Sequence, residues 1–276
     1  MPDKVALVTG ASSGIGAATA IKLKSLGYTV YAAARRTDRM AGLAETGIEV
    51  RGVDVTDDAS MVALMDAIIA ASGRIDILVN NAGYGSYGAL EDVPISEARR
   101  QVEVNLFGLA RMTQLALPHM RTQHTGYIVN VSSVGGKIWT PLGSWYHATK
   151  FAVEGLSDSL RLEAKEFGIK VVVIEPGSIA TEWSKISADT LDAASSGGAY
   201  TSLAKSVSTF FRSTTRKKSD PSVVADIIAT AVTSSRPKTR YAVGQNATRI
   251  LIARKLLSDR AVDNQIMKSF TTEDHA

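Results

Sequence analysis

Tyr146 and Lys150 place a phenol and an ammonium four residues apart in the segment Tyr-His-Ala-Thr-Lys. Residues at positions i and i+4 share one face of a helix, so both groups can face one cavity. A cation close to a phenol favours the phenolate and lowers the phenol pKa from its ordinary value of about 10. Such a phenol can exchange a proton with an alcohol or ketone oxygen near neutral pH. The pair is therefore a candidate for general acid/base chemistry.

A hydroxyl that could bond the same oxygen is available from Ser132 or Ser133, which directly follow the apolar residues 127–131. The apolar run predicts a buried strand, and the end of that strand is a natural place for such a hydroxyl. The residues by themselves allow either serine.

A glycine-rich loop at residues 9–16, Thr-Gly-Ala-Ser-Ser-Gly-Ile-Gly, lies between the first predicted strand and the first predicted helix. Glycines there let backbone N–H groups approach a pyrophosphate, and the helix N-terminus adds partial positive charge. The spacing Gly-x-x-x-Gly-x-Gly differs from the usual Gly-x-Gly-x-x-Gly fingerprint, and three glycines can also simply form a tight turn. The position of the loop favours a dinucleotide site, with the candidate residues Gly10, Ser12, Ser13, Gly14, Ile15 and Gly16.

The end of the second predicted strand, residues 32–36, indicates which dinucleotide is bound. An NAD site has an acidic residue here that bonds the ribose 2′-OH. This chain has Ala34 at that position, and Arg35 and Arg36 follow it. Guanidinium groups bind a 2′-phosphate through charge-assisted hydrogen bonds. NADP (NADPH) is therefore favoured over NAD; the alternative is that both arginines are ordinary surface charges.

Short apolar runs rich in β-branched residues recur along the chain, each followed by a segment of helical period. Continuous apolar strands are buried on both faces, which is typical of a parallel sheet. The alternation predicts an α/β fold, a three-layer doubly wound parallel sheet (Rossmann fold) of about seven strands, in a single domain over residues 1–276. The predicted strand–helix pairs are residues 5–8 and 17–26, 29–33 and 39–45, 49–53 and 59–71, 75–79 and 97–117, and 127–131 and 146–167, followed by a strand at 170–174.

The alternation ends after Pro176. Residues 184–219 are rich in Ser, Thr, Ala and Gly and follow a strand's C-terminal end, where a mobile substrate lid would lie. The alternative is a flexible connection whose aromatic residues merely pack. A last strand is predicted at 240–244, and one helix at 247–270 in a C-terminal tail, residues 247–276.

The composition excludes several chemistries. The 276 residues include no Cys, which removes disulfides, thiolate catalysis and cysteine-based zinc sites, and the four His show no metal-ligand spacing, so we expect no metal. The net charge of +4 is mild, and the one dense basic run, residues 212–218, is typical of a solvated loop, so we expect no nucleic-acid partner. The start of the chain lacks a signal-peptide pattern, and no window approaches the ~20 apolar residues of a membrane span. We expect a cytoplasmic protein.

With these motifs in order, the chain resembles the short-chain dehydrogenase/reductase family, in its type of about 250 residues, over residues 4–180 and more loosely to 245. A weaker similarity, in the Ala-Arg-Arg strand end and the tail after Pro237, is to hydroxysteroid and retinol dehydrogenase-like members. The motifs that carry the resemblance are residues 9–16, Asp54-Val55, Asn-Asn-Ala-Gly at 80–83, Asn105, Ser133, Tyr146, Lys150, and Pro-Gly-x-Ile-x-Thr at 176–181.

The resemblance implies a role for each matching residue. Tyr146 would be the general acid/base, and Ser133, rather than Ser132, would orient the substrate oxygen. Lys150 would lower the tyrosine pKa and bond the nicotinamide ribose, while Asn105 would hold a proton-relay water. The implied cofactor contacts are Asp54 and Val55 at the adenine, Asn81 on the adenosine side, Ile179 and Thr181 at the nicotinamide amide, and further Ala82, Gly83, Pro176 and Gly177.

A substrate is expected beyond the C-terminal ends of the strands. Its wall would be formed by Tyr84, Val134, Trp139, Trp145 and Trp183, although each aromatic residue could also be ordinary packing. Such a lining suits an apolar or aromatic substrate. We therefore expect an NADP(H)-dependent oxidoreductase that interconverts a ketone or aldehyde and an alcohol. The alternatives are a 3-oxoacyl thioester reductase and a non-catalytic NADP-binding sensor on the same fold.

Two segments bear on assembly. The predicted helices at 97–117 and 146–167 resemble those through which family members pair, so we expect a homodimer or homotetramer. The final helix combines Arg and Lys with Ile and Leu, which suits either a membrane surface or docking on its own domain or on a partner subunit.

Overall fold

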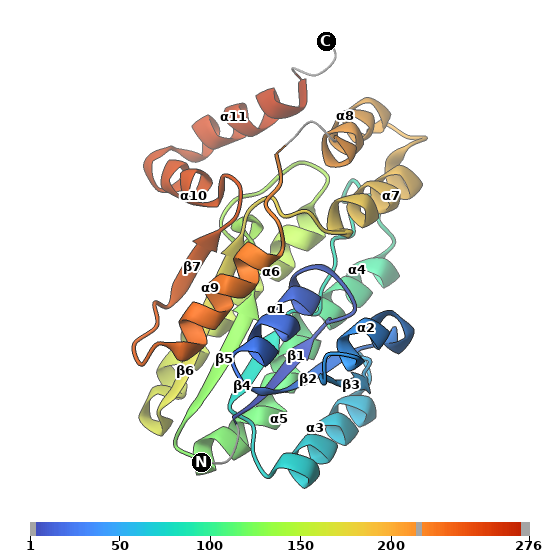
Figure 1. Cartoon of the computed structure of the whole chain (residues 1–276). Helices are drawn as coiled ribbons and strands as arrows, with labels where there is room; N and C mark the ends of the chain where they lie inside the picture. The colour runs from blue at the N-terminus through green and yellow to red at the C-terminus, as the bar shows by residue number, and fades with distance from the viewer. Residues whose placement is uncertain (1–3, 214–216, 272–276) are drawn as a thin grey trace.

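Seven parallel strands form one sheet in the order β3-β2-β1-β4-β5-β6-β7 (Figure 1). The structure is a computed structural model, and it describes residues 4–213 and 217–271. All residues of β1 and β4 are buried, as expected for apolar strands covered on both faces. The strands are β1 (Val5–Thr9), β2 (Thr29–Ala34), β3 (Glu49–Gly52), β4 (Ile77–Asn80), β5 (Gly126–Val131), β6 (Ile169–Pro176) and β7 (Arg240–Val243).

Helices cover both faces of this sheet. Alternate residues of β1 enter different cores: Ala6 and Val8 pack with α1 (Gly14–Ser25) and α9 (Ser222–Thr233), whereas Val5 and Leu7 pack on the other face. That second core is completed by α3 (Asp58–Ser72), α5 (Gly108–Thr122) and α6 (Ser144–Glu163). The three layers confirm the predicted doubly wound α/β fold.

The helix predicted at 97–117 is longer and is interrupted. It runs through α4 (Ile95–Val102), a π-helical turn (Glu103–Phe107) and α5. A π-helical turn inside a helix often lies at a functional site, and Asn105 lies in this one. Two other helices end or begin in 3-10 turns: α6 is followed by Lys165–Phe167, and Thr37–Met40 precedes the short α2 (Ala41–Ala44).

The segment expected to form a lid is helical. Helices α7 (Trp183–Ser195) and α8 (Thr201–Arg212) pack against each other, and a third hydrophobic core joins them to Tyr146 and Tyr87. Of the basic run, Arg212 pairs with Asp189 and Asp192 of α7. Residues 214–216 of the expected lid lie outside the described part of the chain.

The prediction of one C-terminal helix is wrong. Helix α10 (Ala247–Leu256) and helix α11 (Asp259–Thr271) are separated at Leu257, whose backbone is extended. Ser258 explains the break, because its hydroxyl accepts a hydrogen bond from the Ala261 N–H and so caps the start of α11.

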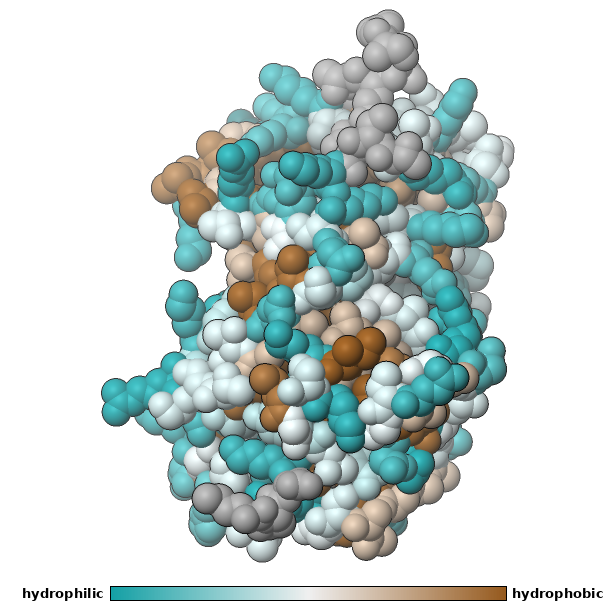
Figure 2. All heavy atoms as spheres, viewed as in Figure 1, coloured by the Kyte–Doolittle hydropathy of each residue, from teal (hydrophilic) through white to brown (hydrophobic). Residues whose placement is uncertain are grey.

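The described part of the tail docks on its own domain. The rings of Phe270 in α11 and Phe210 in α8 lie 4.9 Å apart. Residues 272–276 of the tail lie outside the described part of the chain. Figure 2 shows a mostly polar face of the molecule, with apolar side chains gathered in small separate patches. Across residues 4–213 and 217–271, the helices are all too short or too polar to cross a membrane.

Candidate active site

A cleft of about 1090 Å³ opens at the C-terminal edge of the sheet. It spans the point between β1 and β4 where the strand order reverses, and this is where open α/β sheets bind ligands. Nearly all of the expected cofactor residues line it: Gly10, Ser12, Ser13, Gly14, Ile15, Arg35, Arg36, Asp54, Val55, Asn81, Ala82, Gly83, Tyr146, Lys150, Pro176, Gly177, Ile179 and Thr181.

The glycine positions of the glycine-rich loop have no room for a side chain. Gly14 has φ +55°, and a Cβ atom there would lie 2.9 Å from the Thr181 methyl carbon. A Cβ atom on Gly10, at φ +66°, would lie 2.7 Å from the Cα of Ala82. Gly16 does not line the cleft; it allows close packing, because its Cβ atom would lie 2.5 Å from the amide nitrogen of Asn81. These glycines give the loop its shape.

Asn81 holds the loop in place. Its Nδ2 donates to the carbonyl oxygens of Thr9 (3.0 Å) and Gly10 (3.1 Å). Helix α1 starts directly after Ser13, whose side chain does not cap it, and Ser13, Gly14 and Ile15 line the cleft. The first-turn N–H groups of a helix attract phosphate when no side chain satisfies them. The loop therefore fits the pyrophosphate of a dinucleotide.

Several arginine side chains lie close together beyond the end of β2. Arg36 donates from Nη2 to the Ser12 hydroxyl at 3.3 Å, which brings it beside the glycine-rich loop. Arg39 makes a bidentate ion pair with Glu182, at 2.5 and 3.0 Å, and Arg36 lies 3.8 Å from the same carboxylate. Arg39 and Glu182 were not predicted as site residues from the sequence. The spacing Arg-Arg-x-x-Arg was a usable signal for Arg39, whereas Glu182 comes from 143 residues further on.

Asp54 is held as a carboxylate by its own loop. Its Oδ1 accepts hydrogen bonds from the N–H (3.0 Å) and the hydroxyl (2.8 Å) of Thr56. Burial raises the pKa of Asp54, but these hydrogen bonds and nearby Arg35 outweigh burial and leave the pKa below its ordinary value. An ionised carboxylate can accept hydrogen bonds from a bound ligand.

Tyr146 is buried at the start of α6, where its phenol faces the Ser133 side chain. Burial raises the pKa of Tyr146 to about 12, although the polar interaction with Ser133 acts in the opposite direction. The expectation of a lowered phenol pKa is therefore not met in the protein alone, because the cost of placing a phenolate away from water exceeds the stabilisation that the protein supplies.

The two serines have different surroundings. The Ser133 hydroxyl accepts a hydrogen bond from the Gly135 N–H (3.0 Å) besides contacting Tyr146. The Ser132 hydroxyl is buried and makes no hydrogen bond within the described residues. Both serines line the cleft, but Ser133 is the one in contact with the phenol.

Lys150 is buried one turn after Tyr146. Its Nζ donates to the carbonyl oxygen of Val131, at the end of β5, over 2.9 Å. Burial lowers the pKa of Lys150 to about 8, and Glu154, one turn further along α6, acts to raise it. Glu154 itself is buried and pairs with Lys137 and Arg240, each at 2.9 Å. The lysine is thus fixed in position by β5 and balanced by a buried carboxylate.

Asn105 does not line the cleft. Its Oδ1 accepts from the Tyr84 N–H (3.0 Å), and its Nδ2 donates to the Tyr84 carbonyl (2.9 Å) and the Thr149 hydroxyl (3.1 Å). These bonds use the side-chain amide to join the loop after β4 to the helix that carries Tyr146 and Lys150. The side chain of Asn105 therefore positions these two elements relative to each other.

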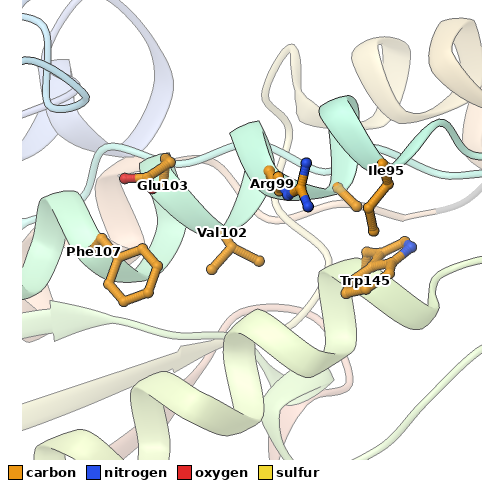
Figure 3. Close-up of a pocket in the computed structure, with 7 residues that line it drawn as sticks. Ile95, Arg99, Val102, Glu103, Phe107 and Trp145 are labelled. Atoms are coloured by element: carbon orange, nitrogen blue, oxygen red, sulfur yellow. The ribbon is translucent and has the colours of Figure 1, made fainter.

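Three of the five expected substrate residues line the cleft: Tyr84, Val134 and Trp183. The two others lie outside it. Trp139 packs under the tail, where its Nε1 donates to Asp263 (2.7 Å) and Arg254 stacks on its ring. Trp145 lines a separate surface pocket between α4 and α6 (Figure 3). Adjacent residues on a helix point about 100° apart, so Trp145 cannot share the direction of Tyr146.

His147 is a further residue that the sequence analysis did not assign to the site. Its Nε2 accepts from the Thr140 N–H (2.9 Å), which leaves Nδ1 as the donor to the Gly135 carbonyl (2.9 Å). Burial lowers its pKa, so the ring is neutral near pH 7. His147 thereby holds both ends of the segment that follows Ser133.

A glycine-rich phosphate loop, a buried Tyr–Lys pair and a strand-end serine in one cleft define a class: oxidoreductases that use a nicotinamide dinucleotide. Comparison with known proteins agrees. The short chain dehydrogenase family model matches residues 4–192, and the chain belongs to this family. YusZ, an uncharacterised oxidoreductase of Bacillus subtilis, is 36% identical over 278 residues, covering 97% of this chain and 99% of that protein.

Solved structures show the same similarity. A short-chain dehydrogenase from Streptomyces avermitilis is 36% identical with a TM-score of 0.81, covering 97% of both chains. A metagenomic short-chain oxidoreductase in complex with NADP is 28% identical (TM-score 0.70; 86% of this chain, 95% of that one). A Burkholderia phymatum short-chain dehydrogenase/reductase in complex with NAD is 27% identical (TM-score 0.77; 96% and 95%). The chain is thus an oxidoreductase acting on CH–OH groups with NAD or NADP.

Proposed function

We propose that this enzyme interconverts a ketone or aldehyde and an alcohol with NADP(H), on an apolar or aromatic substrate, with Tyr146 as general acid/base. The observation that carries the proposal is that Tyr146, Ser133 and Lys150 line the same cleft as the glycine-rich loop. When bound, the cofactor supplies a hydride for the carbonyl carbon. In that direction Tyr146 donates its proton to the carbonyl oxygen, and Ser133 donates a hydrogen bond to the same oxygen.

The raised pKa of Tyr146 supports this role in reduction. A phenol with a pKa of about 12 stays protonated near neutral pH and is ready to donate. Lys150, fixed at the end of β5, places a positive charge on the same side of α6 and stabilises the phenolate that donation leaves behind. Its ammonium also has donors left for the nicotinamide ribose.

The preference for NADP rests on Ala34, Arg35 and Arg36. A carboxylate at position 34 would repel a 2′-phosphate, and this chain has a methyl group there followed by two cleft-lining cations. The substrate class rests on the aromatic lining of the cleft, where Trp183, Tyr87 and Phe211 pack edge to face on one another. Trp183 and Tyr87 also pack on Tyr146. Helices α7 and α8 carry two of these rings, and we assign them the role of a substrate lid on a single catalytic domain.

We also propose a homodimer or homotetramer built on α4 and α6. These helices, with the π-helical turn, expose large apolar side chains, namely Ile95 (55%), Phe107 (54%), Phe151 (43%) and Leu162 (70%). Such a patch marks an interaction surface. Figure 3 shows part of this surface, where Ile95, Phe107 and Trp145 are among the residues that line a surface pocket. We place the enzyme in the cytoplasm.

The test follows NADPH and NADH oxidation separately, by absorbance, against steroids, retinoids, aryl ketones and 3-oxoacyl esters. We expect turnover of an apolar ketone with NADPH well above that with NADH. Equal or better use of NADH would contradict the role given to Arg35 and Arg36. NADP binding without turnover of any substrate would instead indicate a non-catalytic sensor. Turnover of 3-oxoacyl esters alone would indicate a thioester reductase.

A further inference from the structure

Glu182 lies where the cofactor's adenosine end and the substrate wall meet. It follows Thr181, whose methyl group would meet any side chain at Gly14, and it directly precedes Trp183, whose ring packs on Tyr146. Its carboxylate faces the end of β2, where it contacts both Arg39 and Arg36. A single acid at the start of α7 therefore meets Arg36 of the predicted 2′-phosphate site and Arg39 beside it.

Both oxygen atoms of the Glu182 carboxylate are engaged. Oε1 and Oε2 of Glu182 each accept from one guanidinium nitrogen of Arg39, the planar geometry that Arg also offers to a phosphate. Arg36 is 3.8 Å from Oε2 of Glu182 and within hydrogen-bond distance of Ser12. The arrangement resembles an anion-binding site whose anion is a side chain of the protein itself.

We propose that Glu182 competes with the cofactor's 2′-phosphate for Arg36 and Arg39, so that Glu182 and Arg39 set how strongly the enzyme prefers NADP over NAD. This inference rests on the proposed use of NADP. A 2′-phosphate must take these guanidinium groups from Glu182 or bind beside its negative charge, and either event weakens binding. NAD has no 2′-phosphate, and both cofactors share the pyrophosphate, so Glu182 weakens NADP more than NAD.

The effect is expected to be moderate. The three side chains are partly exposed, at 43% for Glu182, 37% for Arg39 and 52% for Arg36, and exposed ion pairs are weak and screened by salt. Glu182→Gln should strengthen binding of a 2′-phosphate by about three- to tenfold, a range that includes relief of repulsion between two anions.

The test measures binding of 2′,5′-ADP and of AMP, which lacks only the 2′-phosphate, by calorimetry at low salt, so that no turnover is required. Glu182→Gln should bind 2′,5′-ADP more tightly than the wild type, with a smaller change for AMP. Arg39→Ala should bind 2′,5′-ADP more weakly, again with a smaller change for AMP. Glu166→Gln is the matched control, because it removes the same charge at a position far from the cleft. Glu166 is exposed in the turn before β6, at the N-terminal end of that strand, whereas the cleft lies at the C-terminal edge of the sheet.

The outcomes separate this inference from the proposed cofactor preference. Unchanged or weaker binding of 2′,5′-ADP by Glu182→Gln overturns the competition, and so does Arg39→Ala with wild-type affinity. If the wild type binds 2′,5′-ADP no better than AMP, the proposed NADP preference fails. In that case a gain of preference in Glu182→Gln still supports the competition, and no gain overturns both.

Discussion

Trp183 covers Tyr146: their ring centroids lie 5.1 Å apart, with the planes tilted by 57°. The first residue of α7 therefore forms the wall beside the proposed acid/base. Because Trp183 belongs to the helices assigned as a lid, the substrate wall and the burial of the phenol depend on the same side chain. The proposed substrate binding and the proposed proton transfer would thus be linked through one ring.

Replacing Trp183 tests this wall. Trp183→Ala should raise KM for an aryl ketone by about tenfold, because an aromatic contact surface of the cleft is lost. Trp145→Ala is the matched control, since Trp145 adjoins Tyr146 in sequence but lines the outer pocket between α4 and α6 (Figure 3). Steady-state kinetics of both variants measure these changes in KM. A larger KM effect at Trp145 than at Trp183 would place the substrate elsewhere.

Gly14 should be required for cofactor binding. Gly14→Ala adds a Cβ atom 2.9 Å from Thr181 in a left-handed backbone conformation. The strain should cost about 1–2 kcal/mol of unfolding free energy, and ADP should bind at least ~10-fold more weakly because the loop is displaced. Thr181→Ser, which removes the touching methyl group, should restore part of the lost affinity in the double variant.

Gly27→Ala is the control that separates backbone strain from displacement of the glycine-rich loop. Gly27 has φ +84° in the turn after α1, with no atom within 4 Å of the added Cβ position. Its alanine variant should lose similar stability in urea and keep wild-type ADP affinity. If Gly27→Ala and Gly14→Ala weakened ADP equally, the close packing of the glycine-rich loop would not be the cause.

His147 should make the fold sensitive to acid. Burial holds its folded-state pKa below the unfolded value of ~6.5, so its stabilising contribution is complete above that pH. The contribution is lost as pH falls below ~6.5, because the unfolded chain takes up the proton first. His147→Asn should lower the unfolding free energy at pH ~7.5 by about 1–3 kcal/mol and flatten this pH dependence.

Urea titrations between pH ~7.5 and ~5.5 measure the effect. His124→Asn is the control, since His124 is exposed and Asn tolerates its positive φ of 51°. An unchanged pH dependence in His147→Asn would show that the bonds to Thr140 and Gly135 do not select the neutral ring.

The apolar face of α4 and α6 should control assembly. Phe107→Glu and Phe151→Glu place charges on two exposed aromatic positions and should shift the mass measured by light scattering toward the monomer. Ile21→Glu changes an equally exposed apolar residue on α1, in the opposite layer, and should leave the mass unchanged. A wild type that is already monomeric would refute the proposed oligomer.

The sheet and the strand-end residues could be predicted from the sequence, because both depend on local patterns. Continuous apolar runs identify buried parallel strands, and glycines after β1 or serines after β5 are fixed to the C-terminal edge by chain direction alone. The Tyr146–Lys150 pair follows equally from helical spacing, and both residues line the cleft.

The failures concern side-chain direction and long-range contact. Trp139 and Trp145 are near Ser133 and Tyr146 in sequence, but helix geometry and the docked tail direct them elsewhere. Glu182 meets Arg39 only because α7 returns over the end of β2. The pKa of Tyr146 depends on burial by Tyr87 and Trp183, which no local pattern contains.

The most direct test of the central claim is Tyr146→Phe, assayed for NADPH-dependent reduction of a ketone that the wild type accepts. Phenylalanine keeps the ring packing and removes only the hydroxyl. We predict that kcat falls by about 10²–10⁴-fold while the Kd for NADPH stays within about twofold of the wild type. Turnover close to that of the wild type would contradict the assignment of Tyr146 as the acid that protonates the substrate oxygen.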